Sequence, residues 1–324
     1  MLYQRPLIGD QAMTRKSEPD TGGERIAKVM ARAGLCSRRE AEAWIAAGRV
    51  AVNGKTIASP ALNIGARDRV AVDGRPLPAR ERTRLFLFHK PRGLVTTTAD
   101  PEGRPTIFGA LPRQLPRLIS VGRLDLSTEG LLLLTNDGGL ARTLELPETG
   151  WLRRYRVRAH GSVTQAALDG LRRGITVDGI RYGPIEAKLD RPQGANVWLT
   201  FAMREGKNRE IRNVLGHLGL KVNRLIRVSY GPFQLGELEA GAIEEVKTRV
   251  LRDQLGERVA RAAGADFSAP LAPIATAKAE AGAGRSDEPR GRGKPTPPPG
   301  RPRPRATTLP GKRGKRGREK ARRR

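Results

Sequence analysis

The chain has 324 residues, and its 61 Lys and Arg against 33 Asp and Glu give a formal net charge of +28. Such an excess attracts a polyanion through counterion release, and nucleic acid is the first candidate. No apolar run is long enough to cross a bilayer, no secretory leader is recognisable, and the lone Cys36 excludes an internal disulfide, so a protein of the reducing cytoplasm is expected.

A small first domain is predicted at residues 24–80, after a polar stretch (1–23) that lacks periodicity and is predicted to be disordered. A short helix with an apolar face ends at Gly34, and the pair Ser37 and Glu40 is typical of a capping box that begins a second helix. Two short strands, at 50–52 and 70–72, each lead into a dipeptide suited to a tight turn. The domain is therefore expected to consist of two small helices packed on a few short strands.

Basic residues decorate this domain, and they are Arg25, Lys28, Arg32, Arg38, Arg39, Arg49 and Lys55. A solvated helix face is the plainer interpretation, although clustered cations near helix N-termini also bind phosphate. The segments at 25–34, 37–41 and 48–54 resemble an S4 RNA-binding domain over the whole module. The resemblance implies that the helix pair and the following loop hold structured RNA through shape and phosphate contacts.

A second, larger domain is predicted at residues 84–256, after a charged linker at 80–84. Strands are predicted at 85–88, 94–98, 130–135, 155–158, 197–203 and 226–229, with helices at 164–173 and 208–218. Because strands outnumber helices and do not alternate with them regularly, an α+β fold with a mixed sheet is expected rather than a doubly wound one.

The last part of the chain, residues 257–324, is rich in Arg, Lys, Gly and Pro and is predicted to be disordered, because such a composition cannot bury a core. Two interpretations of this segment are equally supported. It is a flexible arm that contacts RNA phosphates, or a solubilising tail without a specific role.

One motif suggests chemistry. Residues 122–130 read Gly-Arg-Leu-Asp-Leu-Ser-Thr-Glu-Gly and precede a run of four leucines. An Asp in a loop is most often a turn or capping residue. However, the chain from the His-Lys-Pro-Arg-Gly motif at 89–93 to Gly231 and Pro232 resembles the pseudouridine synthases of the RsuA and RluB type. In that family the Asp of Gly-Arg-Leu-Asp is the essential nucleophile, which implies this role for Asp125.

The chemistry that the resemblance implies needs no cofactor. Uridine becomes pseudouridine when the base is detached from C1′ of the ribose, rotated and rejoined through C5, and this exchange is redox-neutral. The chain accordingly has no phosphate-binding loop of the P-loop type. It has three His and one Cys without ligand spacing, so a catalytic metal is not expected either.

Further site residues follow from the resemblance. Arg212 is predicted to keep the Asp125 carboxylate ionised, and Tyr155 to stack on the extruded base, although a strand Tyr is usually a core residue. Arg123 is expected to hold the flipped RNA, and Lys207 and Arg209 to contact RNA from the basic motif at 205–212. Many family members carry His and Gln where this chain has Arg209 and Glu210, which makes the motif look more like that of the large-subunit branch.

These observations predict an isomerase that modifies ribosomal RNA, most simply as a monomer. Large-subunit RNA is the first choice of substrate and small-subunit RNA the second. An S4-type RNA-binding or ribosome-assembly factor without catalysis is the alternative from another class. A methyltransferase is disfavoured because no suitably placed Gly-rich loop follows a strand.

Overall fold

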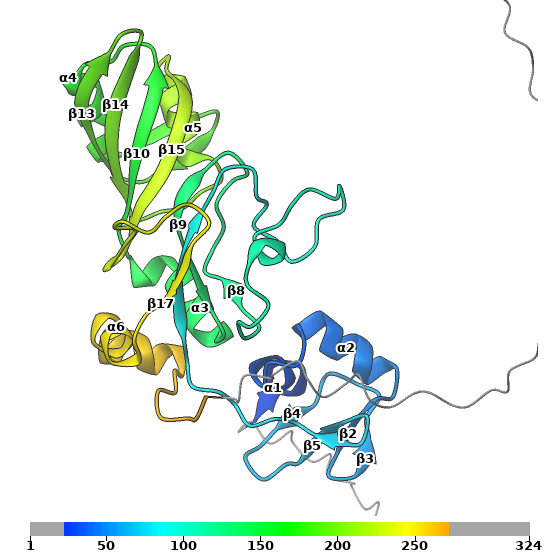
Figure 1. Cartoon of the computed structure of the whole chain (residues 1–324). Helices are drawn as coiled ribbons and strands as arrows, with labels where there is room; N and C mark the ends of the chain where they lie inside the picture. The colour runs from blue at the N-terminus through cyan, green and yellow to red at the C-terminus, as the bar shows by residue number, and fades with distance from the viewer. Residues whose placement is uncertain (1–22, 272–324) are drawn as a thin grey trace, which may run out of the picture. The chain divides into compact units, whose positions relative to one another are not determined.

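The computed structural model describes residues 23–271 (Figure 1). The predicted α+β class is confirmed. Within these residues no helix is both long and apolar enough to span a membrane. The predicted disorder of residues 1–22 and 272–324 falls outside the described residues.

The first domain contains the two predicted helices, α1 (Ile26–Arg32) and α2 (Arg38–Ala46). The Ser37 hydroxyl accepts a hydrogen bond from the Glu40 amide at 3.2 Å, and the Glu40 carboxylate accepts one from the Ser37 amide at 2.6 Å. The predicted capping box is therefore confirmed. Gly34, with φ +81°, follows α1 as expected for a residue that ends a helix.

Short strands complete this domain. They are β1 (Glu24–Arg25), β2 (Val50–Val52), β3 (Lys55–Thr56), β4 (Asn63–Ile64), β5 (Val70–Val72) and β6 (Arg75–Pro76). Strands β3, β2, β5 and β6 form one antiparallel sheet, and β1 pairs with β4. Asn53 and Gly54 both have positive φ, which is the type I′ hairpin geometry that this dipeptide favours. The helices and strands share one apolar core that includes Ile26, Met30 and Ile45.

The second domain is built on a nine-stranded sheet of order β13-β14-β10-β15-β9-β7-β17, with β16 beside β15 and β8 beside β9. The strands are β7 (Leu85–Lys90), β8 (Ile119–Ser120), β9 (Glu129–Thr135), β10 (Arg153–His160), β13 (Ile185–Gln193), β14 (Asn196–Met203), β15 (Lys221–Tyr230), β16 (Phe233–Gln234) and β17 (Ile243–Glu245). A separate hairpin pairs β11 (Ile175–Val177) with β12 (Ile180–Tyr182).

Strands β9 and β15 meet at the middle of this sheet (Figure 1). Their pairing is parallel and short, joining Ile226 to Glu129 and Arg227 to Gly130, whereas the other pairs of the sheet are antiparallel. Residues 131–134 of β9 are fully buried and alternate between two apolar cores. Burial on both faces explains why this strand reads as a continuous leucine run.

The helices of the second domain are α3 (Gly138–Glu145), α4 (Gln165–Asp169), α5 (Glu210–His217) and α6 (Thr248–Ala263), with 3-10 turns at η1 (Phe108–Ala110), η2 (Pro147–Thr149) and η3 (Gly170–Arg173). The two predicted helices correspond to α4 with η3 and to α5. Helix α6 was not predicted. Its Val259 and Ala263 are buried in the core against α3, so the predicted end of the folded domain at 256 is wrong.

The predicted strand at 94–98 is also wrong. In this segment Val95 makes only an isolated bridge to Thr106. Thr96 and Thr97 instead direct their hydroxyls to the carbonyls of Leu124 and Ala99. Short side-chain bonds to nearby backbone compete with a strand ladder, and here they shape a loop.

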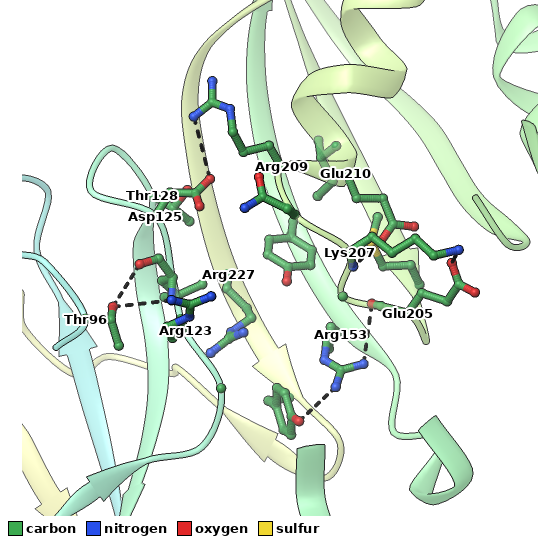
Figure 2. A pocket seen from close by; sticks show the side chains of 18 of the residues that line it. Thr96, Arg123, Asp125, Thr128, Arg153, Glu205, Lys207, Arg209, Glu210 and Arg227 are labelled. Atoms are coloured by element: carbon green, nitrogen blue, oxygen red, sulfur yellow. Dashed lines mark hydrogen bonds and ion pairs between the residues drawn. The ribbon is translucent and has the colours of Figure 1, made fainter. Parts of the chain in front are cut away.

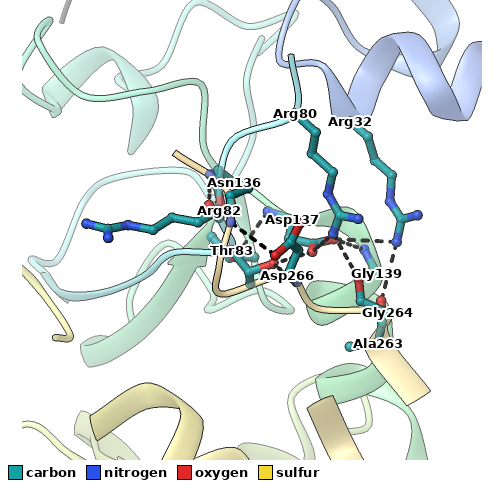
Figure 3. Close-up of polar contacts among 12 residues, drawn as sticks. Arg32, Arg80, Arg82, Thr83, Asn136, Asp137, Gly139, Ala263, Gly264 and Asp266 are labelled. Carbon is teal, nitrogen blue, oxygen red and sulfur yellow. Dashed lines mark hydrogen bonds and ion pairs between the residues drawn. The ribbon is translucent and has the colours of Figure 1, made fainter. Parts of the chain in front are cut away.

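The linker between the domains is tied down by a buried carboxylate. Asp137 accepts hydrogen bonds at 2.7 Å from both Arg80 and Thr83, and its other oxygen caps α3 through the Gly139 amide at 2.8 Å (Figure 3). Asp137 is only 4% exposed, so its charge needs these partners. The predicted linker at 80–84 is thus packed against the second domain.

Candidate active site

A cleft of about 930 Å³ opens over the junction of β9 and β15 (Figure 2). One wall is the loop that precedes β9 and carries Arg123 and Asp125. The other wall is formed by residues 203–211, between β14 and α5. Tyr155 of β10 and Arg227 of β15 line it between these walls. Five of the predicted site residues therefore line one cavity, namely Arg123, Asp125, Tyr155, Lys207 and Arg209, whereas Arg212 is not among its lining residues.

Lys90 holds the Asp125 loop from below. Its side chain is fully buried, and the ammonium group donates to the carbonyls of Pro91, Asp125 and Thr128 at 3.0–3.1 Å. Three donors meet three acceptors, so the main chain on both sides of the Asp125 carboxylate is fixed. The Thr96 hydroxyl adds a bond of 2.8 Å to the Leu124 carbonyl. The loop geometry consequently does not depend on the Asp125 side chain.

The Asp125 carboxylate is about one third exposed and lies 4.0 Å from a guanidinium nitrogen of Arg209 (Figure 2). Arg209 precedes α5 in the left-handed conformation, with φ 51°. Arg212 takes a different position from the predicted one, since its guanidinium donates to the Ser127 hydroxyl at 2.9 Å and to the Val222 carbonyl. The direct ion pair of Asp125 is therefore with Arg209, while Arg212 braces the same loop from behind.

Electrostatics around Arg212 agree with this arrangement. Burial lowers the pKa of its guanidinium, the like charge of Arg209 lowers it further, and the Asp125 carboxylate opposes both effects. Arg212 thus interacts with the Asp125 charge without touching it.

Tyr155 is 8% exposed, and its ring lines the cleft as well as the core. Tyr155 is therefore a core residue that also reaches the cleft, and its stacking on an extruded base stays a prediction. Across the sheet it pairs with Phe201 on one side and with Arg227 on the other. Directly paired residues project from the same face of a sheet, so the side chains of Tyr155 and Arg227 lie on one face.

Several lining residues were not predicted from the sequence. Arg153 donates to the Tyr230 hydroxyl at 2.9 Å and lies over its ring. Glu205 pairs with Lys207 at 3.0 Å, and a hydrogen bond from the Gly183 amide holds the pKa of this carboxyl below its usual value. Glu210 is buried and accepts a bond from the Lys207 amide, and burial raises its pKa. Their signal in the sequence was weak, because charged residues are common throughout this chain.

The predicted RNA-binding cations of the first domain are mostly exposed, namely Arg25, Arg38, Arg39, Arg49 and Lys55. Arg49 pairs with Asp73 and lies over the Trp44 ring, while Lys28 pairs with Glu24. Arg38, Arg39 and Lys55 form no ion pair within the described residues. Among residues 23–271, no cluster of His, Cys, Asp and Glu has the makings of a metal site.

The burial of Lys90 predicts that the free energy of unfolding depends on pH. Desolvation lowers the pKa of Lys90 to about 8, with Asp125 and Glu129 opposing the shift. Between about pH 8 and the usual lysine value near 10.4, the unfolded chain binds a proton that the folded protein has released. The contribution of Lys90 to the free energy of unfolding therefore rises with pH across this window.

Lys90→Met removes this titration and leaves the three carbonyls without their donor. Urea denaturation of both proteins at pH 7 and pH 10 measures the effect. The free energy of unfolding of the wild type, relative to that of Lys90→Met, should be higher at pH 10 than at pH 7. An unchanged difference would show that Lys90 titrates with its ordinary pKa.

Two family models match this chain. The S4 domain model matches residues 24–76, and the RNA pseudouridylate synthase model matches residues 84–217. The fold and the cleft therefore belong to an RNA-modifying isomerase with an RNA-binding domain in front of it. The chain belongs to the family of RNA pseudouridine synthases that carry an N-terminal S4 domain.

Particular relatives place it more closely. An uncharacterised RNA pseudouridine synthase of Rickettsia felis is 45% identical over 228 residues, which cover 70% of this chain and 99% of that protein. Ribosomal large subunit pseudouridine synthase B of Pseudomonas aeruginosa is 42% identical, covering 73% of this chain and 63% of that one. A crystal structure of a pseudouridylate synthase covers 72% of this chain and 99% of its own, with 28% identity and a TM-score of 0.51.

Proposed function

We propose that this enzyme isomerises one uridine of large-subunit ribosomal RNA, with Asp125 as the nucleophile. The observation that carries the proposal is the cleft in which the Asp125 carboxylate, paired with Arg209, shares one cavity with the Tyr155 ring. A carboxylate, a cation and an aromatic ring are the groups that an extruded nucleotide needs. The names of the curated relatives support the choice of large-subunit RNA.

The reaction begins when the target uridine leaves its stack, because a stacked and paired nucleotide does not present C1′ to a side chain. Tyr155 then receives the uracil ring on its face. The exposed cations at the rim, Arg123, Lys207 and Arg209, bind the phosphates on either side of the flipped nucleotide. These contacts place C1′ of the ribose next to Asp125.

Asp125 next attacks C1′ through one carboxylate oxygen as the bond from C1′ to N1 of the base breaks. In the alternative route, the same carboxylate removes a proton from the ribose. In either route Asp125 acts as an anion, with Arg209 paired to it and Arg212 bonded to Ser127 of the same loop. The uracil rotates, and its C5 bonds to C1′ as the bond between C1′ and Asp125 breaks or, in the alternative route, as the ribose takes its proton back from Asp125. C5 then loses its proton with assistance from the Tyr155 hydroxyl, and N1 takes up a proton.

The first domain supplies affinity for the RNA and sets where along the RNA the enzyme binds. Its exposed Arg and Lys side chains, together with the N-terminus of α2, suit the phosphates of structured RNA. The proposed enzyme works as a monomer in the cytoplasm. It requires no cofactor or metal, because the isomerisation is redox-neutral and consumes no energy source.

The test is incubation of the purified protein with ribosomal RNA from a strain that lacks its gene, followed by carbodiimide-based mapping of pseudouridine. One new site in large-subunit RNA is expected. A site in small-subunit RNA instead would overturn the substrate assignment. Tight binding of ribosomal RNA without any new pseudouridine would point to a binding or assembly factor.

A further inference from the structure

The side chain of Arg227 is distinctive because it is buried in the cleft while part of its hydrogen-bonding capacity has no partner among the described residues. It is 3% exposed, yet it lines the same cavity as Tyr155 and the Asp125 loop. Figure 2 shows Arg227 near Arg123 of that loop. Its Nε donates to the Leu131 carbonyl at 2.7 Å, and its guanidinium lies 5.1 Å from the centre of the Tyr230 ring. These two contacts fix the direction in which the group points.

The remaining hydrogen-bonding capacity of Arg227 is not satisfied. Its Nη2 has no hydrogen-bond partner, and no carboxylate lies within ion-pair distance of it, among the residues that the structure describes. A buried cation without a counter-ion is unfavourable unless something else completes its environment. A purely structural bond to Leu131 would need only a neutral donor, so the charge itself calls for another explanation.

We infer that Arg227 binds a carbonyl oxygen of the extruded uracil and stabilises the negative charge that the base acquires when it leaves C1′. This inference rests on the proposed function. The electron pair of the C1′–N1 bond stays with the uracil, which becomes an anion with its charge shared among N1, O2 and O4. Arg227 keeps its proton throughout and stabilises this anion through a fixed guanidinium donor.

The position of Arg227 favours the base over a backbone phosphate. Arg227 pairs directly with Tyr155 across the sheet, so its side chain projects from the same face as the ring on which the uracil is proposed to stack, and both residues line the cleft. Phosphates remain with the RNA backbone at the mouth of the cleft, where Arg123, Lys207 and Arg209 are exposed. A buried donor on the same face as the aromatic ring suits a carbonyl at the edge of the inserted base.

The experiment is a cycle of enzyme and substrate changes under single-turnover conditions. Wild type, Arg227→Gln and Arg227→Lys are compared on an RNA fragment around the mapped target, with uridine, 2-thiouridine or 4-thiouridine at that position. Sulfur accepts hydrogen bonds poorly. If Arg227 contacts one of the two oxygens, the rate loss caused by replacing that oxygen with sulfur should therefore depend on whether Arg227 is present. Arg227→Gln is expected to slow the wild-type reaction by about 100-fold, as loss of one oxyanion donor does, with RNA affinity little changed.

The decisive comparison is the thio effect. Replacing the contacted oxygen should slow the wild type about tenfold more than it slows Arg227→Gln, and Arg227→Lys should fall between them. Equal thio effects in all three enzymes at both positions would overturn the inference, although the proposed function would stand. A wild type without activity on any ribosomal RNA would overturn both.

A folding defect is recognised separately. Arg84→Gln serves as the control, because Arg84 is largely buried just before β7 of the same sheet, pairs with Glu245 and does not line the cleft. It should lower the melting temperature and leave the thio effects unchanged. The thio effects on the wild-type enzyme need no variant, so the contact with O2 or O4 is testable even if Arg227→Gln fails to fold.

Discussion

Asp125→Asn should abolish pseudouridine formation while leaving RNA affinity within about twofold of the wild type. The amide has the shape of the carboxylate but neither its charge nor its nucleophilicity, so a loss of rate of at least about 10⁴-fold is expected, the scale seen when a nucleophile is removed. Carbodiimide mapping measures the activity, and filter binding at fixed salt measures the affinity.

The structure explains why folding should survive this change. The Asp125 carbonyl, not its carboxylate, bonds to Lys90 and to the Thr128 amide. Within residues 23–271 the carboxylate itself makes one ion pair, at 4.0 Å, with a half-exposed Arg209, and such a pair adds little stability. Asp169→Asn, on the exposed end of α4, is the matched control and should keep full activity. Activity retained in Asp125→Asn would contradict the assignment of the nucleophile.

Gly130→Ala should destabilise the second domain by more than about 3 kcal/mol, the range of severe backbone and packing defects. Gly130 has φ +102°, and a Cβ there would lie 2.2 Å from the Arg227 carbonyl oxygen and 2.7 Å from the Arg227 nitrogen. Both atoms belong to the main chain of β15, so the clash is not relieved by a side-chain rotation. Urea denaturation measures the free energy of unfolding.

The location of Gly130 makes the effect large. The parallel pairing of β9 with β15 consists of two residue pairs, and Gly130 forms one of them. This pairing joins the two halves of the sheet and also lies beneath the cleft. Gly170→Ala is the control, since its φ is −57° and nothing would crowd the new Cβ. It should be neutral or slightly stabilising. A Gly130→Ala protein as stable as Gly170→Ala would refute this account of the junction.

Much of the fold was predictable because local signals are strong in the relevant segments. The capping box of Ser37 and Glu40 and the turn at Asn53 and Gly54 act within a few residues, so their outcome depends little on the rest of the chain. The leucine run of β9 is unambiguous because both of its faces are covered. Where tertiary partners decide, prediction was poorer, and α6 is the clearest case. Its chain is broken by Gly256 at φ 68°, and its buried residues make sense only against α3.

The residues of the candidate site also divide into those that the sequence predicted and those that it did not. Asp125, Tyr155 and Arg212 were predicted through resemblance to a family, and their proposed roles stay predictions. What the sequence did not indicate is how the site is held. Lys90 and Arg227 act from strands β7 and β15, far from the Asp125 motif in the chain, and only the sheet brings them beneath the cleft. Similarly, no spacing rule distinguishes Arg209, which pairs with Asp125, from Arg212, which supports the loop.

The difference in exposure between the cations of the cleft has a functional consequence. The exposed cations at its rim suit a polyanion that arrives from solution, whereas the buried Arg227 suits an acceptor that arrives only when a base has been extruded. We therefore propose that different arginines recognise the RNA backbone and stabilise the leaving base. The distinction predicts that rim variants weaken binding in a salt-dependent manner, while Arg227 variants slow the chemical step.

The most direct measurement of the central claim follows the hydrogen on C5 of the target base. Ribosomal RNA transcribed with uridine that carries tritium at C5 is incubated with wild-type enzyme and with Asp125→Asn. The account predicts that the wild type releases tritium to water until about one uridine per large-subunit RNA has reacted, and that Asp125→Asn releases none. Release by Asp125→Asn at the wild-type rate, or no release by the wild type, would contradict it.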